Sequence, residues 1–169
     1  VDIRELADNL KHKADWIKNH IRSTEWIDGE GADDNKGWFN SYYDDNCDRV
    51  EGYFPAGVRM MLTGQVFTIM SNTATDEQVK AICESADKYL YKREAGGYRL
   101  NTDFNEVKLN LGRMFGFAYG EKENGAVFSH MTVMYANALY QRGFVREGYK
   151  ALSTLSEHAM DFNTSKIYP

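Results

Sequence analysis

A buried apolar helix followed by a polar-faced helix occurs twice along this 169-residue chain, and this repeat constrains the fold most strongly. Residues 59–71 are apolar on nearly every side, which is typical of a buried helix. Residues 75–91 have a polar face and begin with a capping box formed by Thr75 and Gln78. The same succession recurs over residues 126–142 and 144–162. The alternation predicts two helical layers built from antiparallel pairs.

The remaining segments add one helix and one hairpin to this pattern. Apolar residues recur at helical spacing through residues 1–22, which predicts an amphipathic helix. Two β-prone runs, 38–43 and 49–53, flank a turn-rich spacer and predict a β-hairpin. The sequence therefore predicts a mainly α fold, a partial (α/α) toroid of antiparallel helix pairs with one small β-hairpin. The repeat of about 60 residues exceeds the roughly 34–47 of common helical repeats. Only two or three pairs fit, so we expect residues 1–169 to be a fragment of one barrel domain.

Composition and charge exclude several function classes. The formal charge of −5 and the isoelectric point near 5.4 argue against a nucleic-acid surface. No Lys/Arg run suggests an anionic membrane, and no apolar run is long enough to span one. Two cysteines, Cys47 and Cys83, lack metal-ligand spacing and fit a reduced compartment, so we expect a cytoplasmic protein without a metal or organic cofactor. The 14% aromatic content suits a sugar cleft as well as an aromatic core.

The segment 121–137 is the strongest candidate for a ligand site. A charged, turn-forming stretch from Glu121 to Gly125 runs directly into an apolar, Met-rich helix with His130 near its start. Helix N-termini carry unpaired N–H groups and favour anions. His130 is therefore either a ligand-binding residue or a histidine of the helical core. The other three histidines fall on polar helix faces and are most simply surface residues.

A second candidate is the polar loop 96–104. Arg99 can hold a carboxylate or a phosphate through two hydrogen bonds, and Asn101 can accept hydrogen bonds from hydroxyl groups. Alternatively, these side chains bond to the backbone of their own loop. The chain carries no nucleophile, Walker or metalloprotease motif, and no pair of carboxylates stands out as an acid and a base.

Three segments resemble a known family. Residues 59–67, 96–104 and 119–130 are similar, in the same order, to the inverting β-glucoside phosphorylases of glycoside hydrolase family 94. That family includes cellobiose, cellodextrin, laminaribiose and chitobiose phosphorylases. The resemblance covers roughly residues 1–169, and the Lys122-Glu-Asn-Gly lead-in with His130 is its most specific part.

The resemblance implies an (α/α)6 catalytic barrel and phosphorolysis. Phosphate attacks the anomeric carbon while an aspartic acid protonates the leaving oxygen, which gives an α-sugar 1-phosphate. The substrates would be inorganic phosphate and a β-linked glucose disaccharide or oligosaccharide, and the parent protein would be a homodimer. His130 matches the family histidine that contacts phosphate, and Lys122 and Glu123 match polar residues at the sugar site. Arg99 and Asn101 complete the candidate binding residues.

Two departures from the family pattern qualify this prediction. The general-acid aspartate is expected before Val1, and this chain contains no Trp-Asn-Asp type motif, so we predict that the fragment alone is inactive. The usual Gly-Gly before the histidine helix reads Gly125-Ala126. Two alternatives stay open: a glycoside hydrolase on the same helical toroid, and a non-catalytic carbohydrate-binding helical domain.

Overall fold

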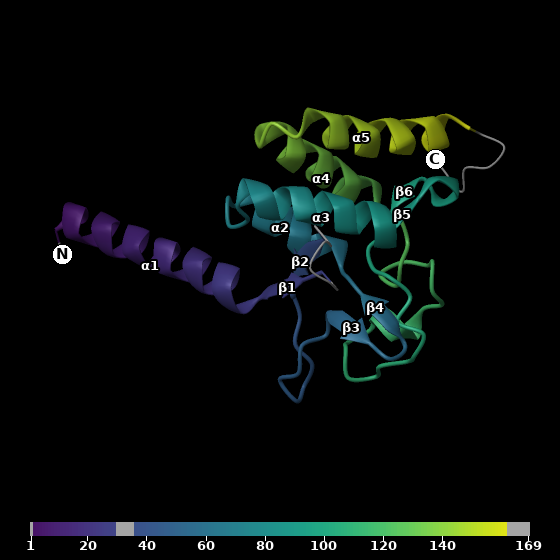
Figure 1. The fold of residues 1–169 in the computed structure, drawn as a ribbon, viewed down its shortest axis with the longest axis horizontal. Coiled ribbons are helices and arrows are strands. Elements are labelled where there is room, and N and C mark those ends of the chain that lie inside the picture. The colour runs from purple at the N-terminus through teal and green to yellow at the C-terminus, as the bar shows by residue number, and fades with distance from the viewer. Residues whose placement is uncertain (1, 30–35, 162–169) are drawn as a thin grey trace.

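The computed structural model describes residues 2–29 and 36–161 and is mainly helical (Figure 1). In this part of the chain, five α-helices carry the fold: α1 Ile3–Thr24, α2 Leu62–Met70, α3 Asp76–Tyr89, α4 Ser129–Gln141 and α5 Val145–Met160. Two 3-10 turns, η1 Arg93–Ala95 and η2 Met114–Gly116, lie in the loops. The predicted mainly α fold class is confirmed.

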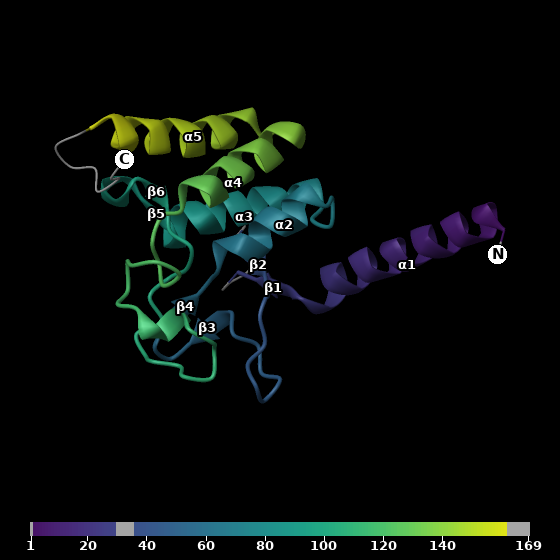
Figure 2. The same cartoon turned by 180° about the vertical axis from the view of Figure 1, so that it is seen from behind.

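The helices pack in layers. α5 lies on α4, and α4 lies on α2, with α3 beside α2; both views of the ribbon show this order (Figures 1 and 2). Gly143 connects α4 to α5. Its φ is 82°, a backbone conformation that glycine adopts with little strain. The main core lies between these helices and includes Trp38, Leu139 and Tyr135.

The helices begin later than the sequence pattern predicts. α2 starts at Leu62 because residues 57–59 belong to a strand, and α4 starts at Ser129 because Phe128 is extended. The capping box of α3 is present in full: the Thr75 side chain accepts from the N–H of Gln78, and the Gln78 side chain accepts from the N–H of Thr75.

The strands form three short antiparallel pairs. β1 (Trp26–Asp28) pairs with β2 (Gly37–Phe39), β3 (Gly52–Phe54) with β4 (Gly57–Arg59), and β5 (Tyr91–Lys92) with β6 (Gly97–Tyr98). The predicted hairpin between 38–43 and 49–53 is therefore wrong in its pairing, and a single bridge between Tyr43 and Arg49 joins the two runs. Tertiary contacts determine which strands pair. The N–H and the carbonyl of Phe39, for example, bond to the Gln65 amide on α2.

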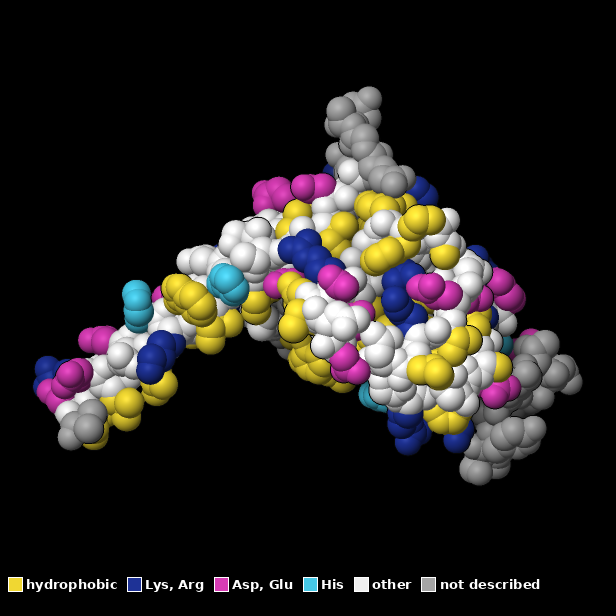
Figure 3. All heavy atoms as spheres, turned by 90° about the horizontal axis from the view of Figure 1, so that it is seen from below, with side chains coloured by type: hydrophobic (Ala, Val, Ile, Leu, Met, Phe, Trp, Pro, Cys, Tyr) yellow, Lys and Arg dark blue, Asp and Glu magenta, His cyan; other side chains and the backbone are white. Residues whose placement is uncertain are grey.

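Helix α1 projects away from the helical layers (Figure 1). Among the described residues, its last turns hold it to the layers: Ile21 packs against the core, and the Arg22 side chain donates to the carbonyls of Asn72 (2.8 Å) and Thr73. Its apolar positions, among them Leu6 and Leu10, are exposed along one side of the arm (Figure 3). The predicted amphipathic helix is confirmed. None of the helices in the described residues has the length and hydropathy of a membrane span.

Candidate functional site

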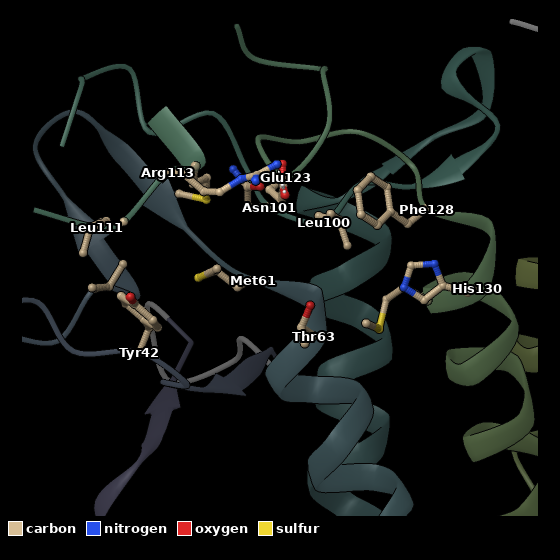
Figure 4. A pocket seen from close by; sticks show the side chains of 14 residues that line it. Tyr42, Met61, Thr63, Leu100, Asn101, Leu111, Arg113, Glu123, Phe128 and His130 are labelled. Atoms are coloured by element: carbon tan, nitrogen blue, oxygen red, sulfur yellow. Dashed lines mark ion pairs between the residues drawn. The ribbon is translucent and has the colours of Figure 1, made fainter. Parts of the chain in front are cut away.

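The first turns of α2 and α4 face a common pocket of about 390 Å³ (Figure 4). Its walls are mostly apolar, with a few polar groups among them. Such a composition is typical of a small-molecule site, in which apolar surface supplies area and polar groups fix orientation. The pocket is lined by Tyr42, Val50, Met61, Thr63, Leu100, Asn101, Leu111, Gly112, Arg113, Met114, Glu123, Phe128, His130 and Met131.

His130 is the second residue of α4 and is exposed at the pocket. The alternative that it is a core histidine is therefore wrong. The N-cap residue, Phe128, supplies no side-chain hydrogen bond to the helix end, and its ring lies 5.4 Å from the imidazole. A histidine beside uncapped N–H groups is a suitable place for an anion.

Thr63 is the second residue of α2 and lines the same pocket. Helix α2 also lacks a side-chain cap on its first turn. Glu51 fixes the backbone just before α2, because its carboxylate accepts a 2.7 Å hydrogen bond from the N–H of Met61. Two helix N-termini with polar second residues thus converge on one space.

Glu51 is a buried residue whose carboxyl group contacts the backbone next to the pocket residue Met61. It accepts from the N–H (2.8 Å) and the hydroxyl (2.5 Å) of Ser41, and only 2% of Glu51 is exposed. Burial raises the pKa of Glu51 to about 7, although its three hydrogen bonds favour the ionised form. Gly64 on α2 lets Ser41 approach closely, because a Cβ there would stand 2.1 Å from that of Ser41.

Glu123 lines another side of the pocket and forms an ion pair with Arg113 (2.8 Å; Figure 4). Its oxygen Oε1 faces Arg113, whereas Oε2 is buried and accepts no hydrogen bond from the described residues. A buried carboxylate oxygen without a donor is costly for the folded state. Lys122, the preceding residue, does not line the pocket; its ammonium lies over the ring of Phe117.

Asn101 is fully buried and organises the loop that leads into α4. Its amide donates to the carbonyl of Thr102 (2.9 Å) and to Oδ1 of Asn124 (3.2 Å), and its own oxygen accepts from the N–H of Gly125 (2.8 Å). Gly125 has a φ of 77° and its Cα faces the Tyr119 ring. Both amide protons of Asn101 are thus used within the chain, so this side chain fixes the Lys122–Gly125 turn.

Arg99 lies at a different pocket, of about 430 Å³, together with His158. Its guanidinium donates to the carbonyl of Gly125 (2.6 Å) and lies over the Tyr119 ring. The structure therefore brings His130, Glu123 and Asn101 to one pocket and places Arg99 and Lys122 outside it.

Sequence reasoning missed Thr63 and Arg113, which also line the pocket. The position of Thr63 near the start of an apolar helix was a usable signal, whereas nothing in the pattern around Arg113 marks it. Tyr42 and Phe128 supply aromatic side chains suited to the apolar face of a sugar ring.

The polar groups of the pocket suit binding better than acid–base catalysis. Of the described residues that line it, only Glu123 carries a carboxyl group, and that group is ion-paired. An acid and a base on opposite sides of a sugar, as hydrolysis with inversion requires, are therefore not both supplied by these residues.

Comparison with known proteins assigns the chain to a family. The family model described as "Glycosyl hydrolase 94 superfamily, catalytic domain" matches residues 3–164. The chain therefore belongs to this family, and the resemblance seen in its motifs is confirmed.

Two curated relatives are phosphorylases by name. A solabiose phosphorylase of Paenibacillus borealis is 26% identical over 125 residues, which is 74% of this chain and 15% of that protein. A cellobionic acid phosphorylase of Neurospora crassa is 27% identical over 85 residues, 50% of this chain and 11% of that protein. The chain thus spans only a small part of the length of the curated relatives it matches.

Proposed function

We propose that this chain is part of a glycoside phosphorylase that cleaves a β-glucosidic bond with inorganic phosphate and inverts the anomeric carbon. The observation that carries the proposal is the placement of His130 at the uncapped start of α4, exposed in a pocket. Family membership and the names of the two phosphorylase relatives support the reaction class.

In the proposed reaction, a phosphate oxygen attacks the anomeric carbon as the glycosidic bond to the leaving sugar breaks. His130 donates a hydrogen bond to phosphate, and the first-turn N–H groups of α4 add further donors. Since phosphate replaces the activated water of an inverting hydrolase, one carboxylic acid is sufficient, to protonate the leaving oxygen. We place that aspartic acid in the part of the protein outside this chain.

Glu123 and Thr63 have supporting roles in this proposal. Glu123 accepts a hydrogen bond from a sugar hydroxyl at the pocket wall, and Thr63 donates a hydrogen bond from the start of α2. Asn101 acts indirectly, since it holds the turn that carries Glu123. Arg99 lies at the neighbouring pocket, where it remains a predicted anion-binding residue, and it takes no part in this step.

The test uses the intact protein with cellobiose, solabiose and cellobionic acid, each with and without phosphate. We expect cleavage to require phosphate and to yield an α-sugar 1-phosphate. The product is detected by ³¹P and ¹H NMR. Release of free sugar without phosphate would contradict the proposal in favour of a hydrolase. Sugar binding without any turnover would contradict it in favour of a carbohydrate-binding domain.

A further inference from the structure

One side of the pocket is built from three separate chain segments, and all three meet at the buried residue Glu51. The pocket residues of these segments are Tyr42, Val50, Met61 and Thr63 (Figure 4). The carboxylate of Glu51 bonds to Ser41 in the first segment and to Met61 in the third, and the second segment is its own. Glu51 is therefore the point at which this side of the pocket is held together.

The two oxygens of the Glu51 carboxylate are divided between the neighbouring segments. Oε1 accepts hydrogen bonds from the N–H (2.8 Å) and the hydroxyl (2.5 Å) of Ser41, and Oε2 accepts from the N–H of Met61 (2.7 Å). An ionised carboxylate has acceptor sites on both oxygens and a fixed distance between them. This one side chain therefore sets the spacing of the loop that carries Tyr42 and the backbone that leads into α2.

Glu51 is itself held in place and lies outside the pocket. Its backbone N–H donates to Oδ1 of Asn40 (3.2 Å), and the N–H of the preceding Val50 bonds to the carbonyl of Tyr42 (3.1 Å). With 2% of its surface exposed, Glu51 is not among the residues that line the pocket. Any effect of Glu51 on a ligand must therefore pass through the residues that it holds.

Thr63 is the residue through which such an effect would reach the ligand. Met61 is the N-cap residue of α2, so its hydrogen bond to Glu51 fixes the chain where it enters the first turn, and Thr63 belongs to that turn. Ser41 also packs against this turn, at Gly64. A misplacement of about 1 Å in a reacting site can lower a rate about 100-fold, so the anchor of this turn matters for the Thr63 hydroxyl.

We propose that Glu51 is a positioning residue of this pocket: its carboxylate sets the distance between the Tyr42 loop and the start of α2, and thereby holds the Thr63 hydroxyl at the ligand. This inference rests on the proposed function and deepens it, because it makes phosphate use depend on a residue that touches no ligand.

A double-variant cycle in the intact protein tests whether Glu51 acts through Thr63. Glu51→Gln keeps the size of the side chain but replaces one acceptor oxygen by an amide donor, which faces an N–H and cannot accept from it. We expect Glu51→Gln to lower kcat/KM for phosphate by about tenfold. In a protein that already carries Thr63→Val, we expect the same change to cost no more than about twofold, because the hydroxyl that Glu51 positions is absent.

Ser41→Ala is a milder variant that weakens the same anchor, and it carries the test if Glu51→Gln does not fold. It removes one of the three hydrogen bonds to the carboxylate and leaves both backbone donors in place. We expect a smaller loss of kcat/KM for phosphate in the same direction, which again disappears in the presence of Thr63→Val.

Ser85→Ala is the matched control for a general loss of stability. Ser85 is fully buried and bonds to the N–H (2.9 Å) and the carbonyl (3.0 Å) of Gly37, and neither residue is among those that line this pocket. We expect Ser85→Ala to lower the melting temperature and to leave kcat/KM for phosphate unchanged, both alone and together with Thr63→Val.

Three results would overturn the inference: an unchanged kcat/KM in Glu51→Gln, equal losses with and without the Thr63 hydroxyl, or a loss in Ser85→Ala as large as that in Glu51→Gln. If the unaltered protein does not use phosphate, the proposed function fails, and this outcome is distinct. Calorimetric titration of phosphate and of cellobiose into the four proteins of the cycle then decides the role of Glu51. Losses of affinity that overlap between Glu51→Gln and Thr63→Val support the inference, and additive losses or no loss contradict it.

Discussion

Thr63 and His130 hold equivalent places in the structure: each is the second residue of its helix, and both line the same pocket. They come from α2 and α4, which pack against each other. Neither helix has a side-chain cap on its first turn. Since helix N-termini carry a partial positive charge, this end of the pocket is where the proposed reaction would place phosphate.

Replacing Thr63 by Val tests this arrangement at α2. Valine keeps the shape of the side chain and removes the hydroxyl. Loss of one hydrogen bond to the charged phosphate, about 1.5–3 kcal/mol, should lower kcat/KM for phosphate in the intact protein by roughly 10–150-fold. The control is Thr68→Val on the same helix, whose hydroxyl bonds to the Gln65 carbonyl. An equal loss in both variants would show that the effect is not local to the pocket.

Glu51 should make the stability of the chain depend on pH. Burial raises its pKa from 4.5 to about 7, so the folded state binds more protons than the unfolded state between these values. The stabilising contribution is complete below about pH 4.5 and is lost as the pH rises through 7, with a slope of at most about 1.4 kcal/mol per pH unit. Urea denaturation of the chain between pH 5 and pH 8 measures this slope.

Glu51→Gln supplies the comparison for that measurement. The variant should lose the part of the pH dependence that Glu51 contributes, whereas Glu94→Gln, at an exposed position, should retain it. Parallel pH profiles for Glu51→Gln and the unaltered chain would show that the pKa of Glu51 is not raised.

Gly125→Ala should disturb the turn that carries Glu123. Gly125 has a φ of 77°, and a Cβ there would lie 2.3 Å from the Tyr119 ring. The change should cost about 1–3 kcal/mol in the free energy of unfolding. Gly143→Ala is the matched control, because Gly143 has a φ of 82° and no atom within 4 Å of the added carbon. Equal losses in urea denaturation would assign the whole effect to backbone strain and none to Tyr119.

Local sequence signals predicted the helices well. The capping box of Thr75 and Gln78 forms as expected because its partners are three residues apart and need no distant contact. The hairpin over 38–53 failed because its strands are short and their pairing depends on distant residues. Phe39, for example, is fixed by Gln65 on α2 and pairs with Trp26.

The candidate site could be predicted only where its residues belong to one contiguous sequence segment. His130 stood out because its lead-in turn and its helix are contiguous in the sequence. Arg113 reaches the pocket through a loop without periodic pattern, and its contact with Glu123 appears only once that loop is folded. Arg99, predicted from its loop as a binding residue, lies at a neighbouring pocket, where its guanidinium donates to the Gly125 carbonyl.

The most direct measurement of the central claim is the phosphate dependence of the intact protein carrying His130→Ala. Because His130 is exposed, the melting temperature should stay close to that of the unaltered protein. Loss of one charge-assisted hydrogen bond, about 1.5–3 kcal/mol, should lower kcat/KM for phosphate by roughly 10–150-fold. His158→Ala, at the pocket of Arg99, should leave this value unchanged. An unchanged phosphate dependence in His130→Ala, or a loss confined to His158→Ala, would contradict the account.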